Sequence, residues 1–212
     1  MSNLFEMFEG QLNNGLADYL SQSTGIDNTQ QTVDASNAIF STLLGAMSKN
    51  AATPEGASAL NNALERDHDG SIFDNALSVL MGSSQPQNTN ALNGSGILGH
   101  ILGGNASNVL GMLSKVTGLD SGKLMSLMIS LAPVIMGLLG KARAQNGIDA
   151  SGIGGLLGSV LGGGNATQQA NSNPLMDILN RVLDKDGDGN MLDDLLGGAG
   201  GNILGGLLGG KR

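Results

Sequence analysis

The sequence predicts an all-α fold: a duplicated multihelical bundle with two central buried helices, glycine-rich connections and a glycine-rich tail. Three observations lead to this prediction. Apolar residues recur at helical spacing, and no alternating strand pattern is found. Short blocks of sequence recur in the same order along the chain. The 35 glycines cluster beside Leu and Ile, so they do not form a polar linker.

The composition limits both the core and the class of protein. Hydrophobic residues make up 40% of the chain and aromatic residues 2%, so we expect a core of Leu, Ile, Val, Met and Ala. The net charge of −8, without a basic stripe, argues against nucleic-acid binding. The absence of Cys excludes disulfides and thiolate zinc sites. The start, "MSNLFEMFEGQL", does not read as a secretory signal, so we expect a cytoplasmic protein.

The first predicted repeat spans residues 1–82. Leu16 and Leu20 recur at helical spacing, Gly25 ends that helix, and Asp27 can cap the next one. The block "IFSTLLGAMSK" is apolar on a broad face, which is typical of a helix at the centre of a bundle. The repeat ends with an aspartate loop at 65–75, and a polar linker containing Pro and Asn follows at 83–95.

The second predicted repeat, residues 96–161, carries the same blocks and packs on the first. "LSKVTGLD" matches "LSQSTGID", so Gly118 and Asp120 take the roles of Gly25 and Asp27. "LAPVIMGLLGK" corresponds to "IFSTLLGAMSK", and "ASGIGGLL" to "ASALNNAL". We expect the two central helices to pack as a pair, with Gly45 and Gly137 allowing a close approach of their backbones.

The most apolar run, residues 124–140, lies in this second central helix. It falls short of the roughly 18 to 20 residues that a spanning helix needs, and Pro133 interrupts it. We interpret it as a buried helix, and the alternative is a membrane hairpin.

The paired "TGID" and "TGLD" turns, the "LLG" and "MGLLG" helices, the loop "RDHDGSI" and the glycine-leucine blocks resemble the bacterial YidB-like proteins, a family of unknown function. The resemblance covers roughly residues 1–160. It implies an all-helical fold around central buried helices and a bacterial source. It carries over no catalytic residue, and we expect the protein not to be an enzyme.

After a second linker at 162–173, residues 174–196 read as a helix, an EF-hand-like aspartate loop and a second helix. Calcium loops place oxygen ligands at positions 1, 3, 5 and 7, Gly at position 6 and a carboxylate at position 12. Position 6 is Gly189 and position 12 is Leu195, so an earlier acid would have to close the shell. The predicted ligands are Asp184, Asp186, Asp188 and Asn190, with Asp193 or Asp194 closing the site.

The loop of the first repeat fits the same frame around Gly70, again without the twelfth carboxylate. Its predicted ligands are Glu65, Asp67, Asp69, Ser71 and Asp74. We therefore expect Ca²⁺ of modest affinity at both loops, with Mg²⁺ as a competitor.

The alternative is that these acids only cap helices. "SIFD" and "NMLD" both resemble capping boxes, which accounts for the last acid of each loop without a metal. Of the two histidines, we expect His68 to be a solvated loop position and His100 a packing residue.

The tail, residues 197–212, repeats Gly every four residues, a spacing that lets helices pack closely. The predicted function is that of a non-enzymatic calcium-binding structural or interaction protein, with a second copy or another protein as partner. The alternative is a self-associating or membrane-surface protein that acts through its glycine-leucine helices without spanning the membrane. A metal-dependent hydrolase lacks a nucleophile or base beyond the loop acids.

Overall fold

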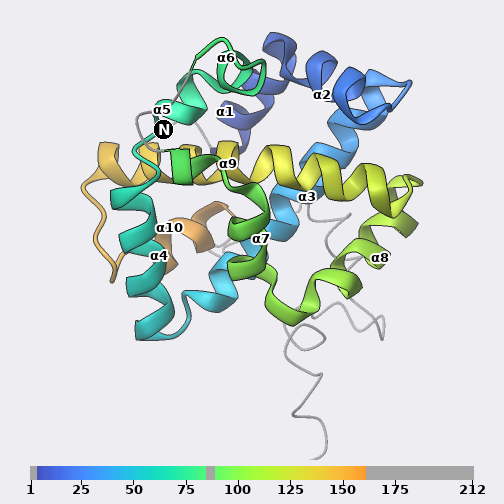
Figure 1. The fold of residues 1–212 in the computed structure, drawn as a ribbon. Coiled ribbons are helices and arrows are strands. Elements are labelled where there is room, and N and C mark those ends of the chain that lie inside the picture. The colour runs from blue at the N-terminus through green and yellow to red at the C-terminus, as the bar shows by residue number, and fades with distance from the viewer. Residues whose placement is uncertain (1–3, 85–88, 161–212) are drawn as a thin grey trace, which may run out of the picture. The chain divides into compact units, whose positions relative to one another are not determined.

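The computed structural model describes residues 4–84 and 89–160. These residues form helices and no strand, which confirms the all-α fold (Figure 1). The elements in chain order are α1 (Leu4–Gln11), the π-helix η1 (Leu12–Leu16), α2 (Ala17–Thr24), α3 (Thr29–Asn50), α4 (Pro54–Arg66), α5 (Ser71–Asp74), α6 (Ala76–Leu80), the 3-10 helix η2 (Thr89–Leu92), α7 (Gly94–Leu102), the 3-10 helix η3 (Gly103–Asn105), α8 (Ala106–Thr117), α9 (Ser121–Asn146) and α10 (Ile153–Val160).

The chain divides into two units, Met1–Gln168 and Gln169–Arg212, and every described residue belongs to the first. Three of the predicted segments lie outside the described residues: the linker at 162–173, the module at 174–196 and the tail at 197–212. The predicted linker at 83–95 is described in part. It contains η2 and also Asn93, whose side chain caps α7 by accepting from Gly96 N at 2.9 Å.

Helix α9 is the centre of the first unit. Every residue from Leu131 to Gly140 is buried, so this part of the helix is covered on all faces. It contacts α1, α2, α3, α4, α5, α7 and α8. Figure 1 shows α9 crossing the middle of the unit, with α5 and α6 on one side and α4 and α7 on the other. The sequence explains this position, because a helix that is apolar all round belongs in an interior.

Pro133 does not interrupt this helix, contrary to our expectation. Proline lacks the N–H that would bond to the carbonyl four residues earlier, which is that of Ile129. The first residue of α7, Gly94, packs against this freed carbonyl, and a Cβ at Gly94 would lie 2.0 Å from its oxygen. The break in the hydrogen-bond ladder is therefore placed where another backbone approaches.

Because the helix continues through Pro133, its length also differs from our expectation. Among the described residues, Ser121–Asn146 is the one helix long and apolar enough to cross a membrane. Of the most apolar 18-residue window of this helix, 67% is buried inside the structure.

Helix α3 is the second central helix, and it packs on α9. Its buried face includes Ile39, Phe40, Leu43, Leu44 and Met47. The core differs from our expectation in one respect, because three of the four Phe side chains gather here. Phe8 stacks on Phe40 with ring centroids 4.5 Å apart, and Phe5 lies 6.0 Å from Phe40. These rings join the N-terminal helix to α3.

The two glycines that we expected to bring α3 and α9 together do not face one another. A Cβ at Gly45 would meet nothing within 4 Å. A Cβ at Gly137 would lie 2.9 Å from the backbone N of Phe73, in α5. The expectation was wrong because equivalence in sequence does not determine which neighbour a small residue faces.

The turns "TGID" and "TGLD" have matching structures. Gly25 and Gly118 both adopt positive φ, at 69° and 71°, and end α2 and α8 as predicted. The hydroxyls of Ser21 and Ser114 donate to the carbonyls of Ile26 and Leu119, which are equivalent positions. The duplication that relates residues 1–82 to residues 96–161 stays a prediction.

The caps after these turns differ by one residue. Asp120 caps α9 as predicted, accepting from Lys123 N at 3.0 Å. In the first turn Asn28, not Asp27, caps α3 by accepting from Gln30 N and Gln31 N. The reason is that α3 begins one residue later after its glycine than α9 does.

Candidate functional site

The aspartate loop at 65–75 lies on the C-terminal half of α9. Gly70 has φ of +101°, and a Cβ there would lie 2.8 Å from Cβ of Lys141. A Cβ at Gly140 would lie 1.5 Å from the carbonyl oxygen of His68. The turn and the helix therefore meet backbone to backbone. This contact accounts for glycine at the sixth loop position without a metal.

The predicted ligands of this loop interact with different partners and do not converge on one point. Glu65 pairs with Arg143 at 2.8 Å and Asp74 with Lys141, both on α9. Asp67 pairs with its neighbour Arg66 at 2.8 Å.

Asp69 accepts from the backbone N–H of Ser71 at 2.9 Å, at the start of α5. The hydrogen bond from the Ser71 side chain lowers the pKa of the Asp69 carboxyl. Within the described part of the chain, no group of three or more His, Cys, Asp or Glu residues is placed to hold a metal. The predicted capping box "SIFD" does not form, because α5 begins after Gly70 without a side-chain cap and Asp74 pairs with Lys141. Ca²⁺ at these residues stays a prediction. The ligands predicted at 184–194 lie outside the described residues.

His68 occupies a different environment from the solvated one that we expected. It is only 4% exposed, because the turn carries its backbone onto Gly140 and its ring into the interior. Burial lowers the pKa of His68, and the charges of Asp67 and Asp69 offset part of this effect. The imidazole is therefore neutral at pH 7. Its Nδ1 is buried and has no hydrogen-bond partner among the described residues. Leaving such an atom unsatisfied costs about 1–3 kcal/mol.

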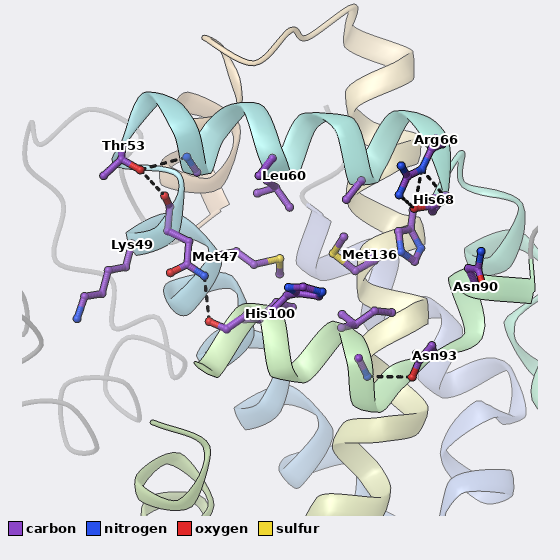
Figure 2. A pocket seen from close by; sticks show the side chains of 18 residues that line it. Met47, Lys49, Thr53, Leu60, Arg66, His68, Asn90, Asn93, His100 and Met136 are labelled. Atoms are coloured by element: carbon purple, nitrogen blue, oxygen red, sulfur yellow. Dashed lines mark hydrogen bonds and ion pairs between the residues drawn. The ribbon is translucent and has the colours of Figure 1, made fainter. Parts of the chain in front are cut away.

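The His68 ring borders a cavity of about 770 Å³ between α4 and α7. Figure 2 shows the ring projecting from the end of α4 into the space between the two helices. The floor is formed by Met47 of α3 and Met136 of α9. The apolar lining residues are Met47, Ala59, Leu60, Ala63, Ile97, Ile101 and Met136. We refer to this space as the α4–α7 cavity.

Polar side chains lie at the two ends of the α4–α7 cavity, and several already have partners. At one end, Thr53 accepts from Gly56 N at 3.1 Å, and Asn50 donates to the Ile101 carbonyl at 3.0 Å. At the other end, Arg66 is bonded to Asp67. Three buried side-chain atoms lack a partner in the described residues, and they belong to Ser36, Asn37 and His68. Of these residues only His68 lines the cavity, and its Nδ1 is itself closed to solvent.

Sequence reasoning missed this cavity, although a signal was present. Leu60, Leu64 and His68 follow one another at a spacing of four, a pattern typical of one face of a helix, although α4 ends at Arg66. His100 also differs from our expectation, because it is exposed and lines the cavity instead of packing in the core. It lies on the side of α7 that faces α4 across the open space, so it stays accessible to solvent.

The chain matches a model of a known protein family. The model of a family described as bacterial protein of unknown function (DUF937) matches residues 6–142. No curated protein and no solved structure matches the chain. The matched range includes every residue that lines the α4–α7 cavity.

Proposed function

Because the chain belongs to this family of bacterial proteins of unknown function (DUF937), we propose a function from the α4–α7 cavity. The protein is a non-enzymatic helical binding protein that holds a small, largely apolar ligand between α4 and α7. Its narrower identity as a YidB-like protein, based on the turns and the loop quoted above, is part of the same proposal.

The observation that carries this proposal is the cavity itself, whose lining combines the apolar residues named above with polar groups at its two ends. Small-molecule pockets measure roughly 300–1,000 Å³ and combine apolar walls with a few placed polar groups. The cavity of about 770 Å³ fits this description. The two methionines of its floor add to the support, since flexible thioether side chains adapt to irregular ligands.

Binding without catalysis is supported by how the polar groups of the lining are engaged. The Asp67 carboxylate, next to His68 in the chain, accepts from the Arg66 guanidinium. The lining residues that the structure describes include no serine, and Thr53 lies at the opposite end from His68 (Figure 2). A nucleophile–base pair needs hydrogen-bond reach between its members.

The test is saturable binding of the fluorescent probe N-phenyl-1-naphthylamine to the full chain. The blocking variant is Ala59→Trp, on an exposed residue of α4 that lines the cavity. The matched control is Ser58→Trp, on the adjacent exposed residue that does not line it. We expect Ala59→Trp to weaken probe binding at least about tenfold and Ser58→Trp to leave it unchanged. Absence of saturable binding, or equal binding by both variants, contradicts the proposal.

A second candidate function is calcium binding at the loop of residues 184–190, with Asp193 or Asp194 closing the site. The observation that favours it is the alternation of three aspartates before Gly189, since crowded carboxylates repel one another without a cation or open solvent. The ion would fix the loop and the start of the following helix.

The test of this candidate is calorimetric titration of Ca²⁺ into metal-stripped protein. We expect binding in the millimolar range that Asp186→Asn with Asp188→Asn removes, with Mg²⁺ competing. The matched variant, Asp67→Asn with Asp69→Asn, changes the other loop and decides whether it binds a second ion. No heat at millimolar Ca²⁺ contradicts this candidate, and self-association that persists with a chelator then favours the glycine-leucine helices.

A further inference from the structure

Three side chains that carry metal-binding atoms line the α4–α7 cavity. They are Met47 of α3, His100 of α7 and Met136 of α9, which lie far apart in the sequence. Figure 2 shows the two methionine side chains extending toward each other along the floor of the cavity, with the His100 ring projecting from α7 into the same space. Two thioether sulfurs and an imidazole from three helices therefore meet in one cavity.

The packing of the two methionines holds their sulfur atoms at the floor. Met47 is 1% exposed and Met136 4%, and the helices that carry them, α3 and α9, pack on each other. The core therefore fixes the stems of both side chains, and Figure 2 shows their sulfur ends at the cavity. A flexible thioether can adjust the position of its sulfur to an ion. A site carried by helices is also more precise than one carried by loops.

His100 supplies the third donor from the opposite side. It is exposed and lies on the face of α7 that borders the cavity, so its ring is accessible to an ion that enters from solvent. Imidazole is a ligand for several transition metals, copper among them. The exposed position of His100, which core packing does not explain, thereby has a chemical use.

The donor atoms select against the commoner metals. Ca²⁺ and Mg²⁺ take several oxygen ligands, whereas the one carboxylate among the described lining residues, that of Asp67, accepts from the Arg66 guanidinium. Structural Zn²⁺ sites use thiolates, and the chain has no Cys. Thioethers are soft donors that select Cu(I). A monovalent ion also brings the smallest charge into an apolar cavity, where burial of charge is costly.

We infer that Met47, His100 and Met136 form a Cu(I) site at the floor of the α4–α7 cavity. The three donors include no carboxylate, so this site is separate from the predicted calcium loops. The inference goes beyond the proposed function and does not rest on it, because it needs three donor atoms and no organic ligand.

The test is calorimetric titration of Cu(I), kept reduced under argon as its acetonitrile complex, into the full chain at pH 7.5. We expect one Cu(I) to bind per chain. Met47→Leu and Met136→Leu nearly conserve volume and should each weaken binding at least about tenfold, as should His100→Gln. The matched control is Met128→Leu, the same substitution at a buried residue of α9 that does not line the cavity, and it should leave the affinity unchanged.

Absence of saturable binding overturns the inference. So does an affinity that is unchanged in any of the three ligand variants, or an equal loss in Met128→Leu. X-ray absorption at the copper edge of the loaded, unaltered chain decides the question if the variants do not fold. We expect sulfur and nitrogen directly bound to copper, and a spectrum without sulfur ligands overturns the inference. This titration and the probe assay above use different ligands, so each can fail without the other.

Discussion

The contact between the aspartate loop and α9 makes Gly140→Ala the most informative substitution. The new Cβ would lie 1.5 Å from the carbonyl oxygen of His68, a distance that no side chain can occupy. The obstructing atom belongs to the backbone of a turn held on α9 by Gly70 and by the buried Phe73. The turn would have to move away from the helix.

The magnitude follows from two opposing effects. Alanine inside a helix is more favourable than glycine by about 1 kcal/mol. Overpacking typically costs about 1–3 kcal/mol, and we take about 3 kcal/mol because a backbone must shift. The expected net loss is about 2 kcal/mol of unfolding free energy. For a chain of this size, this loss corresponds to a melting temperature lower by about 4–8 °C.

Gly45→Ala is the matched control, because Gly45 also lies inside a long helix and its Cβ would meet nothing within 4 Å. It should stabilise the protein by about 1 kcal/mol. The assay is urea unfolding followed by circular dichroism, with the slope checked for two-state behaviour. If Gly140→Ala is as stable as Gly45→Ala, the turn does not rest on α9 as described and our reasoning about the loop fails.

Three further predictions concern the same region. The lowered pKa of His68 means that protonation favours the unfolded chain, so the unfolding free energy should fall as the pH drops below about 6.5. His68→Gln should remove this component, and an unchanged pH profile would argue against a buried imidazole. Asp69→Ala should lose about 1 kcal/mol with the bond to Ser71 N, measured by urea unfolding, whereas Asp69→Asn keeps an acceptor and should lose less. Lys141→Ala should lose about 1 kcal/mol or less at low salt, because the ion pair with Asp74 is partly exposed; a loss independent of salt would contradict an electrostatic origin.

The sequence alone determined the helices and several of their ends. Gly118 and Asp120 identified the junction of α8 and α9, because a positive-φ glycine and a side-chain cap are local features that act within a few residues. The central position of α9 followed from its composition, because a helix without a polar face has to be surrounded.

The roles of the loop residues could not be obtained in this way. The spacing of Glu65, Asp67 and Asp69 suggested a shared cation. In the structure Glu65 pairs with Arg143, 78 residues away along the chain, and Asp74 pairs with Lys141, 67 residues away. A spacing rule compares neighbours in sequence, so it cannot register a cation that another helix supplies.

The cavity and the burial of His68 were decided by tertiary structure. Gly140 appeared in the sequence as one small residue among many, yet its missing side chain is what allows the turn to rest on α9 and carry the His68 ring inside. Helix periodicity and caps depend on interactions within one or two turns, which a short stretch of sequence contains. A cavity depends on which faces of distant helices meet and on the volume that their side chains leave unfilled, and only the assembled fold determines that.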